Sequence, residues 1–269
     1  LSLAIDIFTN QYHKPFLHQL ISGQLDVDRM DYLSRDSFFS GVSEGVIGYD
    51  RILKMLTVHQ GQLMIEEKGI YSVEKFLVAR RQMYWQVYLH KTVLSAEKML
   101  VKIIQRVRSI YNDHRNSLAT GSQVDFFLGE FNGPMNAETI KRFCLMDDFD
   151  VISAIKKWST HSDKVLSLLC MRMLNRNIYK TSIQATPFEG SFVEAKKQQV
   201  MQQFGVNEEE ANFLCFTGIA TNTTYQSKEE KINILYKDGT VKDITEVDNS
   251  MIQQNLSSQI KKFYICLLT

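Results

Sequence analysis

The amino-acid sequence predicts a mainly α-helical protein that ends in a small α+β unit, and three observations support this prediction. Only 3 prolines occur in 269 residues, so long helices can run without interruption. Residues 72–111 contain neither glycine nor proline and keep helical periodicity. Beyond residue 178, short strand-like stretches are separated by turn signals. We therefore expect a helical part over residues 1–178 and an α+β unit over residues 179–269.

The first part of the chain predicts short elements. Apolar residues at helical spacing indicate a helix around residues 17–21 and a second over 26–40, where Met30, Leu33 and Phe38 recur. Glycines then interrupt the pattern before another short element at residues 49–56. The stretch QLMIEEKG predicts a short strand that ends in a turn at Gly69.

The segment from Ser72 to Tyr111 gives the strongest helix prediction. It forms either one very long helix or two helices joined by a bend near Thr92, with the N-cap close to Ser72 and Glu74. A loop is expected over residues 116–122. Further elements are predicted as helices over 137–146, 149–160, 162–176 and 191–205, strands over 179–185, 212–221 and 262–268, and a hairpin over 231–245 that turns at residues 237–239.

Composition excludes several classes of protein. The formal net charge is +1, so no overall positive field favours polyanions, and binding to nucleic acid is possible but not favoured. The four cysteines form no C-x-x-C pair and lie in apolar stretches, which predicts buried free thiols in a reducing compartment. Neither a membrane span nor a signal peptide is indicated, so we expect a cytoplasmic protein.

The most unusual stretch is LDVDRMDYLSRD, which gathers four carboxylates and two arginines. On a helix, Asp28, Tyr32 and Asp36 follow one another at i, i+4 and i+8, with Arg29 and Arg35 beside them. Carboxylates edged by guanidinium groups can hold a hard cation together with a phosphate. The same pattern also fits a solvated face of surface ion pairs. Spacing alone leaves both interpretations open.

The longer stretch GQLDVDRMDYLSRDSFFSGV resembles the last signature of the HD-domain phosphohydrolases, in the branch of the deoxynucleoside triphosphate triphosphohydrolases. This resemblance implies that Asp28 is the final, catalytic metal-ligating aspartate. It also implies that Arg29 contacts phosphate, that Tyr32 lies near the phosphates and sugar, and that Asp36 faces the sugar.

A second stretch, FLVARRQMYWQVYLHK, is similar to the segment of that branch in which an arginine and a tyrosine stand eight residues apart. By this resemblance Arg80 grips phosphate and Tyr88 packs against the deoxyribose. The spacing predicts that both lie on one helix face. This chain has Tyr84 and Trp85 where the branch has basic and histidine residues, so the resemblance does not extend to a regulatory nucleotide site, and the need for an activator nucleotide stays open. Without the resemblance, this aromatic run would fit a core or an oligomer interface.

The resemblance also implies a fold and an activity. The chain matches the C-terminal portion of an HD domain, so we expect the histidine and the His-Asp pair of the metal centre to lie upstream of Leu1, and the divalent metal site (Mg, Mn or Fe) to be incomplete here. The implied reaction is metal-dependent hydrolysis of a deoxynucleoside triphosphate to deoxynucleoside and triphosphate, in a homo-oligomer.

Two alternatives stay open. The chain is an enzyme only if the parent protein supplies the missing ligands; otherwise it is a non-catalytic helical module that binds a nucleotide or a partner and retains the HD scaffold. A phosphodiesterase or nucleotidase on the same scaffold would differ in its product.

Overall fold

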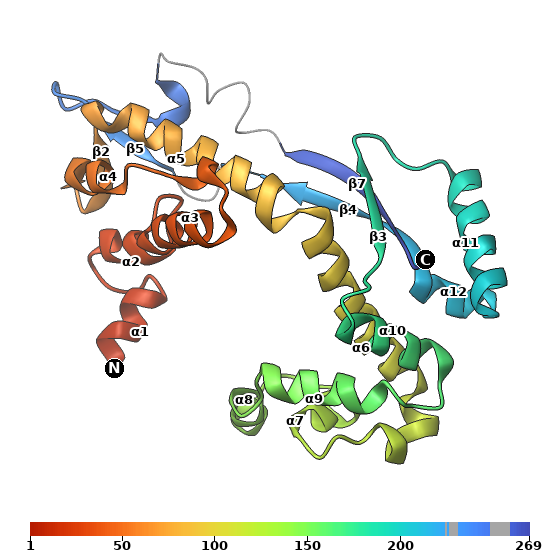
Figure 1. Cartoon of the computed structure of the whole chain (residues 1–269). Helices are drawn as coiled ribbons and strands as arrows, with labels where there is room; N and C mark the ends of the chain where they lie inside the picture. Colours follow the sequence, from red (N-terminus) through yellow and green to blue (C-terminus); the bar gives the residue numbers. More distant parts are fainter. Residues whose placement is uncertain (224, 226–230, 248–258) are drawn as a thin grey trace. The chain divides into compact units, whose positions relative to one another are not determined.

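The computed structural model describes residues 1–223, 225, 231–247 and 259–269 (Figure 1). These residues form a mainly α-helical fold with short strands, which confirms the predicted fold class. The chain divides into two compact units. The first contains Leu1–His90 and Ala220–Lys261, and the second contains Lys91–Ile219 and Lys262–Thr269.

The first unit combines helices with a mixed four-stranded sheet. Its elements are α1 (Ser2–Phe8), α2 (Pro15–Ser22), α3 (Val27–Ser40), η1 (Ser43–Gly45), α4 (Tyr49–Met55), β1 (Leu56–His59), β2 (Gln62–Glu66), η2 (Glu67–Gly69), α5 (Ile70–Met83), η3 (Tyr84–Tyr88), β5 (Asn233–Leu235), β6 (Val241–Asp243) and η5 (Ile244–Glu246). The strand order is β1-β2-β5-β6, in which β2 and β5 run parallel and the other two pairs run antiparallel. The strand predicted at QLMIEEKG is β2.

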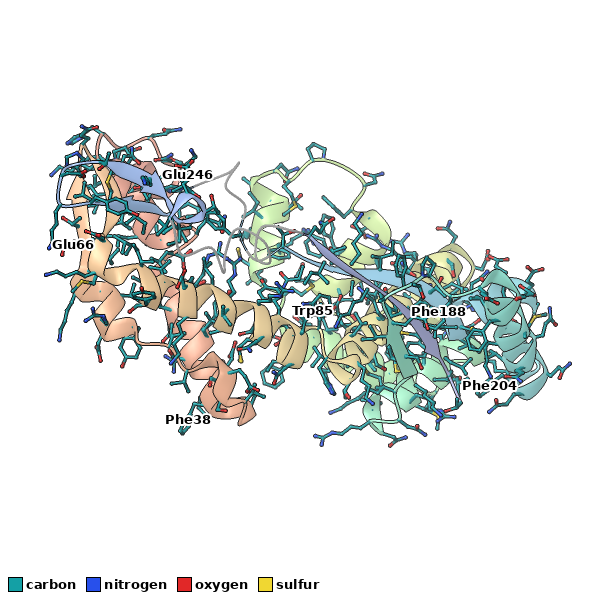
Figure 2. The ribbon with its side chains drawn as sticks, turned by 90° about the horizontal axis from the view of Figure 1, so that it is seen from above. Phe38, Glu66, Trp85, Phe188, Phe204 and Glu246 are labelled. Carbon is teal, nitrogen blue, oxygen red and sulfur yellow. The ribbon has the colours of Figure 1, made fainter. Side chains whose placement is uncertain are left out.

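The core of the first unit fixes α3 against α5. Helix α5 buries Val73, Phe76 and Leu77 completely, at the i, i+3, i+4 spacing of one helix face. Helix α3 contributes Leu33 to the same core and contacts α5, and the two helices lie side by side in Figure 1. Burial of such apolar side chains stabilises by about 1.5–3 kcal/mol each. Phe38 was expected on the apolar face of α3, but it is 79% exposed and points outward in Figure 2.

The long segment from residue 72 folds as two helices. Helix α5 begins at Ile70, after Gly69 and without a side-chain cap, so the cap predicted near Ser72 is wrong. The chain leaves helical geometry at Leu89, which has φ −105° and ψ 19°, and α6 (Lys91–Leu118) begins two residues later. The bend predicted near Thr92 is therefore confirmed to within a few residues. The loop expected from residue 116 starts after Leu118, because α6 continues to that residue beyond a kink at His114, which has φ −123° and ψ 17°.

The second unit contains the remaining helices and a three-stranded sheet. Its elements are α6, α7 (Gln123–Asp125), η4 (Phe126–Glu130), α8 (Ala137–Cys144), α9 (Asp148–Trp158), α10 (Lys164–Leu174), β3 (Lys180–Gln184), α11 (Gly190–Phe204), α12 (Glu208–Leu214), β4 (Cys215–Asn222) and β7 (Ile260–Leu267), in which the last two strands reach the boundary with the first unit. The strand order is β3-β7-β4. The strand expected from residue 212 begins only at Cys215, because Asn207 caps α12 ahead of it.

The predicted hairpin over residues 231–245 is present, with Gly239 at φ +85° in its turn. Its strand β5 pairs with β2 of the first unit. The predicted domain boundary between residues 178 and 179 falls inside the second unit. Because compactness does not measure independent folding, that boundary stays a prediction.

Three of the four cysteines are buried free thiols, whereas Cys144 is exposed. The prediction of a buried thiol is therefore wrong for Cys144. It lies at the end of α8, a short helix that buries only Thr139, so the apolar residues around Cys144 do not enclose it. Among the described residues, no helix is both long and apolar enough to cross a bilayer.

We expect the folded protein to react with a thiol reagent at Cys144 alone. Burial raises the pKa of Cys170 to about 12 and also raises the pKa of Cys215 and Cys266, which leaves these three sulfurs unreactive near neutral pH. Titration with a chromogenic disulfide should release one equivalent from the native chain and none from Cys144→Ser. A second fast-reacting thiol in the native chain would contradict this assignment.

Candidate functional site

Helix α3 begins at a carboxylate cap that also engages an arginine. Asp26 has extended backbone geometry, and its Oδ1 accepts a hydrogen bond from the Arg29 backbone N–H at 2.7 Å. The Arg29 Nε donates to Asp26 Oδ2 at 3.0 Å and to the Gly23 carbonyl at 2.9 Å. Burial raises the pKa of Asp26 although the bonds from Arg29 oppose that rise. The Arg29 charge is therefore paired with Asp26.

A tyrosine from η3 is bonded to the far end of α3. The Tyr88 hydroxyl donates to Asp36 Oδ2 at 2.6 Å. Burial, and next the bond to Asp36, raise the pKa of Tyr88 far above the usual range for a phenol. Tyr88 therefore keeps its proton near neutral pH and holds the Asp36 carboxylate in a fixed position. The structure brings together these two residues, which the family resemblance assigned to the sugar.

Three tyrosines, Tyr32, Tyr84 and Tyr88, form what we call the tyrosine cluster. The ring centroids of Tyr32 and Tyr88 lie 6.0 Å apart at 80°, and those of Tyr84 and Tyr88 lie 5.2 Å apart at 74°. These are edge-to-face contacts. Burial and the neighbouring Tyr84 raise the pKa of Tyr32, whereas Arg80 and Arg29 lower it, so both guanidinium groups act on this phenol.

The geometry of η3 aligns Arg80 with the tyrosine cluster. On a regular α-helix, residues eight apart are turned by about 80° relative to one another, so spacing alone would separate Arg80 from Tyr88. Residues Tyr84–Tyr88 form a π-helical turn in which the Leu89 N–H donates to the Tyr84 carbonyl at 2.7 Å. A π-turn accommodates one extra residue, which turns later side chains back by about 100°. By this geometry Arg80 and Tyr88 are expected to share a face, which stays a prediction, whereas the structure places the Arg80 guanidinium carbon 5.9 Å from the centre of the Tyr84 ring.

Arg80 is a buried guanidinium without a counter-anion among the described residues. It is 8% exposed, and its Nε has no hydrogen-bond partner. Its Nη1 lies 3.4 Å from the Gln24 amide oxygen, and its guanidinium carbon lies 5.9 Å from the centre of the Tyr84 ring. Burial of an unpaired charge is costly, and proteins retain such groups where a ligand supplies the partner. Arg80 is thus the clearest candidate for an anion-binding residue.

Asp28 lies one helical turn before Tyr32 on α3. It lies in the first turn of α3, where its carboxylate is exposed and has no hydrogen-bond or ion-pair partner among the described residues. Helix α3 is a regular α-helix, so Asp28, Tyr32 and Asp36 turn by about 80° in all and follow one side of it. No group of three or more metal-ligating side chains occurs in the described part of the chain. The residues present fit one metal ligand rather than a complete site.

Sequence reasoning missed the roles of Asp26 and Gln24. The Asp26 cap has a local signal, since an aspartate before an apolar helical pattern is a typical N-cap. Gln24 has none, because its contact with Arg80 depends on how α3 packs against α5. Arg35, expected beside the site, pairs instead with Asp31 at 2.8 Å on the surface. This exposed ion pair agrees with the alternative interpretation of the stretch, in which it forms a solvated helix face.

A separate cavity of about 310 Å³ lies beside α3 and α4, away from the tyrosine cluster. Its lining is mostly apolar, and its one acidic residue, Asp31, is neutralised by Arg35. It offers no unpaired charge, so the Arg80 region remains the stronger candidate for a functional site.

Comparisons with known proteins agree with this fold. A family described as "HD associated region" matches residues 47–127, a range that includes Arg80 and Tyr88. The crystal structure of the phosphohydrolase BT4208 from Bacteroides thetaiotaomicron superposes with a TM-score of 0.90 at 45% identity, and the match covers 100% of this chain and 68% of that one. The chain belongs to the HD-domain phosphohydrolase family.

Curated relatives are longer than the chain. The protein YwfO of Bacillus subtilis is 28% identical over 258 residues, which cover 94% of this chain and 58% of the relative. A Dictyostelium discoideum protein named deoxynucleoside triphosphate triphosphohydrolase SAMHD1 homolog is 32% identical over 95 residues, or 33% of this chain and 18% of the relative. The chain spans 58% and 47% of the first two curated relatives that it matches.

Proposed function

We propose that this chain supplies the phosphate- and sugar-binding part of a metal-dependent phosphohydrolase that acts on nucleotides and releases triphosphate from deoxynucleoside triphosphates. The single observation that carries the proposal is the buried Arg80 guanidinium, which lacks a counter-anion in the described residues and lies beside the tyrosine cluster. A phosphate is the anion that a phosphohydrolase must bind, and guanidinium groups suit it because they form directed, charge-assisted hydrogen bonds.

Each residue of the site then has a role. Arg80 binds a phosphate oxygen and stabilises negative charge that develops during cleavage. Arg29, whose charge is compensated by Asp26, lies close to Tyr32 and offers the phosphate a guanidinium group that Asp26 holds in place. Tyr88 and Asp36 present a fixed hydroxyl and carboxylate to the sugar, and Tyr32 packs between sugar and phosphate. This arrangement orients the phosphate ester for attack.

Asp28 is the residue of this chain that we assign to the metal. Its exposed carboxylate has no partner among the described residues, as an open ligand position requires. We propose that the other ligands come from the part of the longer protein that lies outside this chain. When bound, the metal supplies an activated water and polarises the phosphate. The family resemblance of the sequence leads us to propose a homo-oligomer as well.

Product analysis with the intact protein tests the proposed reaction. Deoxynucleoside and ribonucleoside triphosphates are incubated with Mg²⁺ or Mn²⁺, and the phosphorus products are separated. Triphosphate and free deoxynucleoside are expected. Nucleoside monophosphate or inorganic phosphate as the first product would reassign the protein to a phosphodiesterase or a nucleotidase. Nucleotide binding without turnover would identify the non-catalytic binding module.

We expect Asp28→Ala to lower metal-dependent turnover in the intact protein by at least about a hundredfold, because a lost ligand weakens the metal that activates the attacking water. Folding should stay normal, since the Asp28 side chain is exposed and makes no bond to a described residue. The matched control is Asp31→Ala, which removes an exposed carboxylate from the same helix. Retained turnover in a folded Asp28→Ala protein would refute the metal role.

A further inference from the structure

The charge near the tyrosine cluster comes from few groups. Two guanidinium groups act on Tyr32, those of Arg80 and Arg29. Arg29 is already neutralised, because its Nε is shared between Asp26 and the Gly23 carbonyl. Arg80 has no carboxylate within ion-pair distance in the described residues. Of these two guanidinium groups, only Arg80 therefore offers a ligand a positive charge that no carboxylate of the described residues compensates.

The residue one helical turn after Arg80 is an uncharged aromatic. Side chains at i and i+4 lie on the same helix face, so position 84 is where a second cation could reach the anion that Arg80 binds. Tyr84 occupies this position, and its ring lies 5.9 Å from the Arg80 guanidinium carbon. An aromatic face attracts a cation without neutralising it, in contrast to a carboxylate.

The other side of the cluster is negative. Asp36 accepts the bond from Tyr88 with one oxygen, Oδ2, and Asp28 lies two turns earlier on α3 with a free carboxylate. Additional phosphates of one ligand would meet like charge along α3, which disfavours them. The charges around the tyrosine cluster therefore match a single phosphoryl group next to a sugar.

We propose that the Arg80 region of this chain binds one phosphoryl group of its nucleotide, and that Tyr84 is the positioning residue that holds the Arg80 guanidinium in place while leaving its charge free. The proposal rests on the proposed function and adds to it the number of phosphoryl groups held here and a role for Tyr84. The π-turn is part of this device, since Tyr84 opens it and Tyr88 closes it.

Calorimetric titration of the full chain tests the number of phosphoryl groups. The probes are deoxyadenosine, deoxyadenosine 5′-monophosphate and deoxyadenosine 5′-triphosphate, at constant ionic strength and without metal. We expect the two nucleotides to bind with dissociation constants within about threefold of each other, and deoxyadenosine at least about tenfold more weakly. A triphosphate that binds more than about tenfold tighter than the monophosphate would overturn the proposal while supporting the proposed function. Failure of all three probes to bind would count against both.

Two variants test the role of Tyr84. The readout is the ratio of the dissociation constants of deoxyadenosine and its monophosphate, which isolates the contribution of the phosphate. We expect Tyr84→Leu, which removes the aromatic face, to lower this ratio about three- to tenfold, and Tyr84→Phe, which keeps the face, to preserve it. Because deoxyadenosine binding is measured in the same variant, general damage to the site would weaken both ligands and leave the ratio unchanged. An unchanged ratio in Tyr84→Leu would refute the positioning role.

Discussion

The Arg80→Met variant is expected to be more stable than the natural chain, by about 1–3 kcal/mol in the free energy of unfolding. Arg80 is 8% exposed and has no ion-pair partner among the described residues, so the folded state bears the cost of removing a charge from water. Methionine has a similar length and suits the apolar neighbours on α5, and replacing buried charge by a packed hydrophobic residue commonly stabilises. Urea unfolding at pH 7 measures the difference.

The matched control for this variant is Lys75→Met, an exposed position on the same helix. Like Arg80→Met, it replaces one positive charge by methionine. Because Lys75 is exposed, its charge pays no desolvation cost in the folded state, and the free energy of unfolding should equal that of the natural chain. A natural protein that retains a destabilising group does so where function requires it. Loss of stability in Arg80→Met would show instead that Arg80 is a structural residue, and the anion site would lose its main support.

The Arg106→Ala variant is expected to lose about 2–4 kcal/mol of unfolding free energy. This loss is near the lower end of the range for breaking a buried ion pair, because some water reaches the two side chains. Arg106 donates to both oxygens of Asp163, with Nε at 3.1 Å and Nη2 at 2.6 Å, and reaches Glu210 at 3.4 Å. The same Asp163 caps α10 through the Leu166 N–H. Removing the arginine leaves a carboxylate that is 12% exposed without its cation.

The pH dependence of stability provides a second readout for Arg106→Ala. Burial raises the pKa of Asp163, but the bonds from Arg106 and Leu166 outweigh that rise, so the pKa is lowered overall. A lowered carboxyl pKa contributes stability above the unfolded pKa of about 3.9, and this contribution is lost as the pH falls through the folded pKa. The unfolding free energy of Arg106→Ala should therefore lack this fall at acid pH. Arg115→Ala, which breaks an exposed pair with Glu130, is the control and should change little.

Local sequence patterns predicted the helices well because the relevant physics is local. The range 26–40 coincides with α3 and its Asp26 cap, and the range 191–205 coincides with α11, which ends at Gly205 in left-handed geometry. The π-turn could not be predicted, since no glycine or proline marks it. The contacts made from this turn join Tyr88 to Asp36 and Tyr32 of α3, which are distant in the sequence.

Pairings between distant segments were also outside the reach of sequence patterns. Strand β1 was not predicted, and the parallel pair of β2 with β5 joins Ile65 to Ile234. Such contacts depend on which segments the fold brings together, not on local propensity. The site shows the same limit. Arg80, Tyr88 and Asp36 were found through resemblance, whereas the contacts of Gln24 and Tyr84 with Arg80 emerge only from the packing of the first unit.

Binding of deoxyadenosine 5′-monophosphate to the full chain and to Arg80→Met tests the central claim most directly. Calorimetry should give saturable binding of one equivalent to the natural chain and to Lys75→Met. For Arg80→Met, which should be the more stable protein, we predict a dissociation constant at least about tenfold higher, because the phosphate loses a charge-assisted partner. Equal affinity of Arg80→Met and the natural chain would contradict the assignment of Arg80 as the phosphate-binding residue.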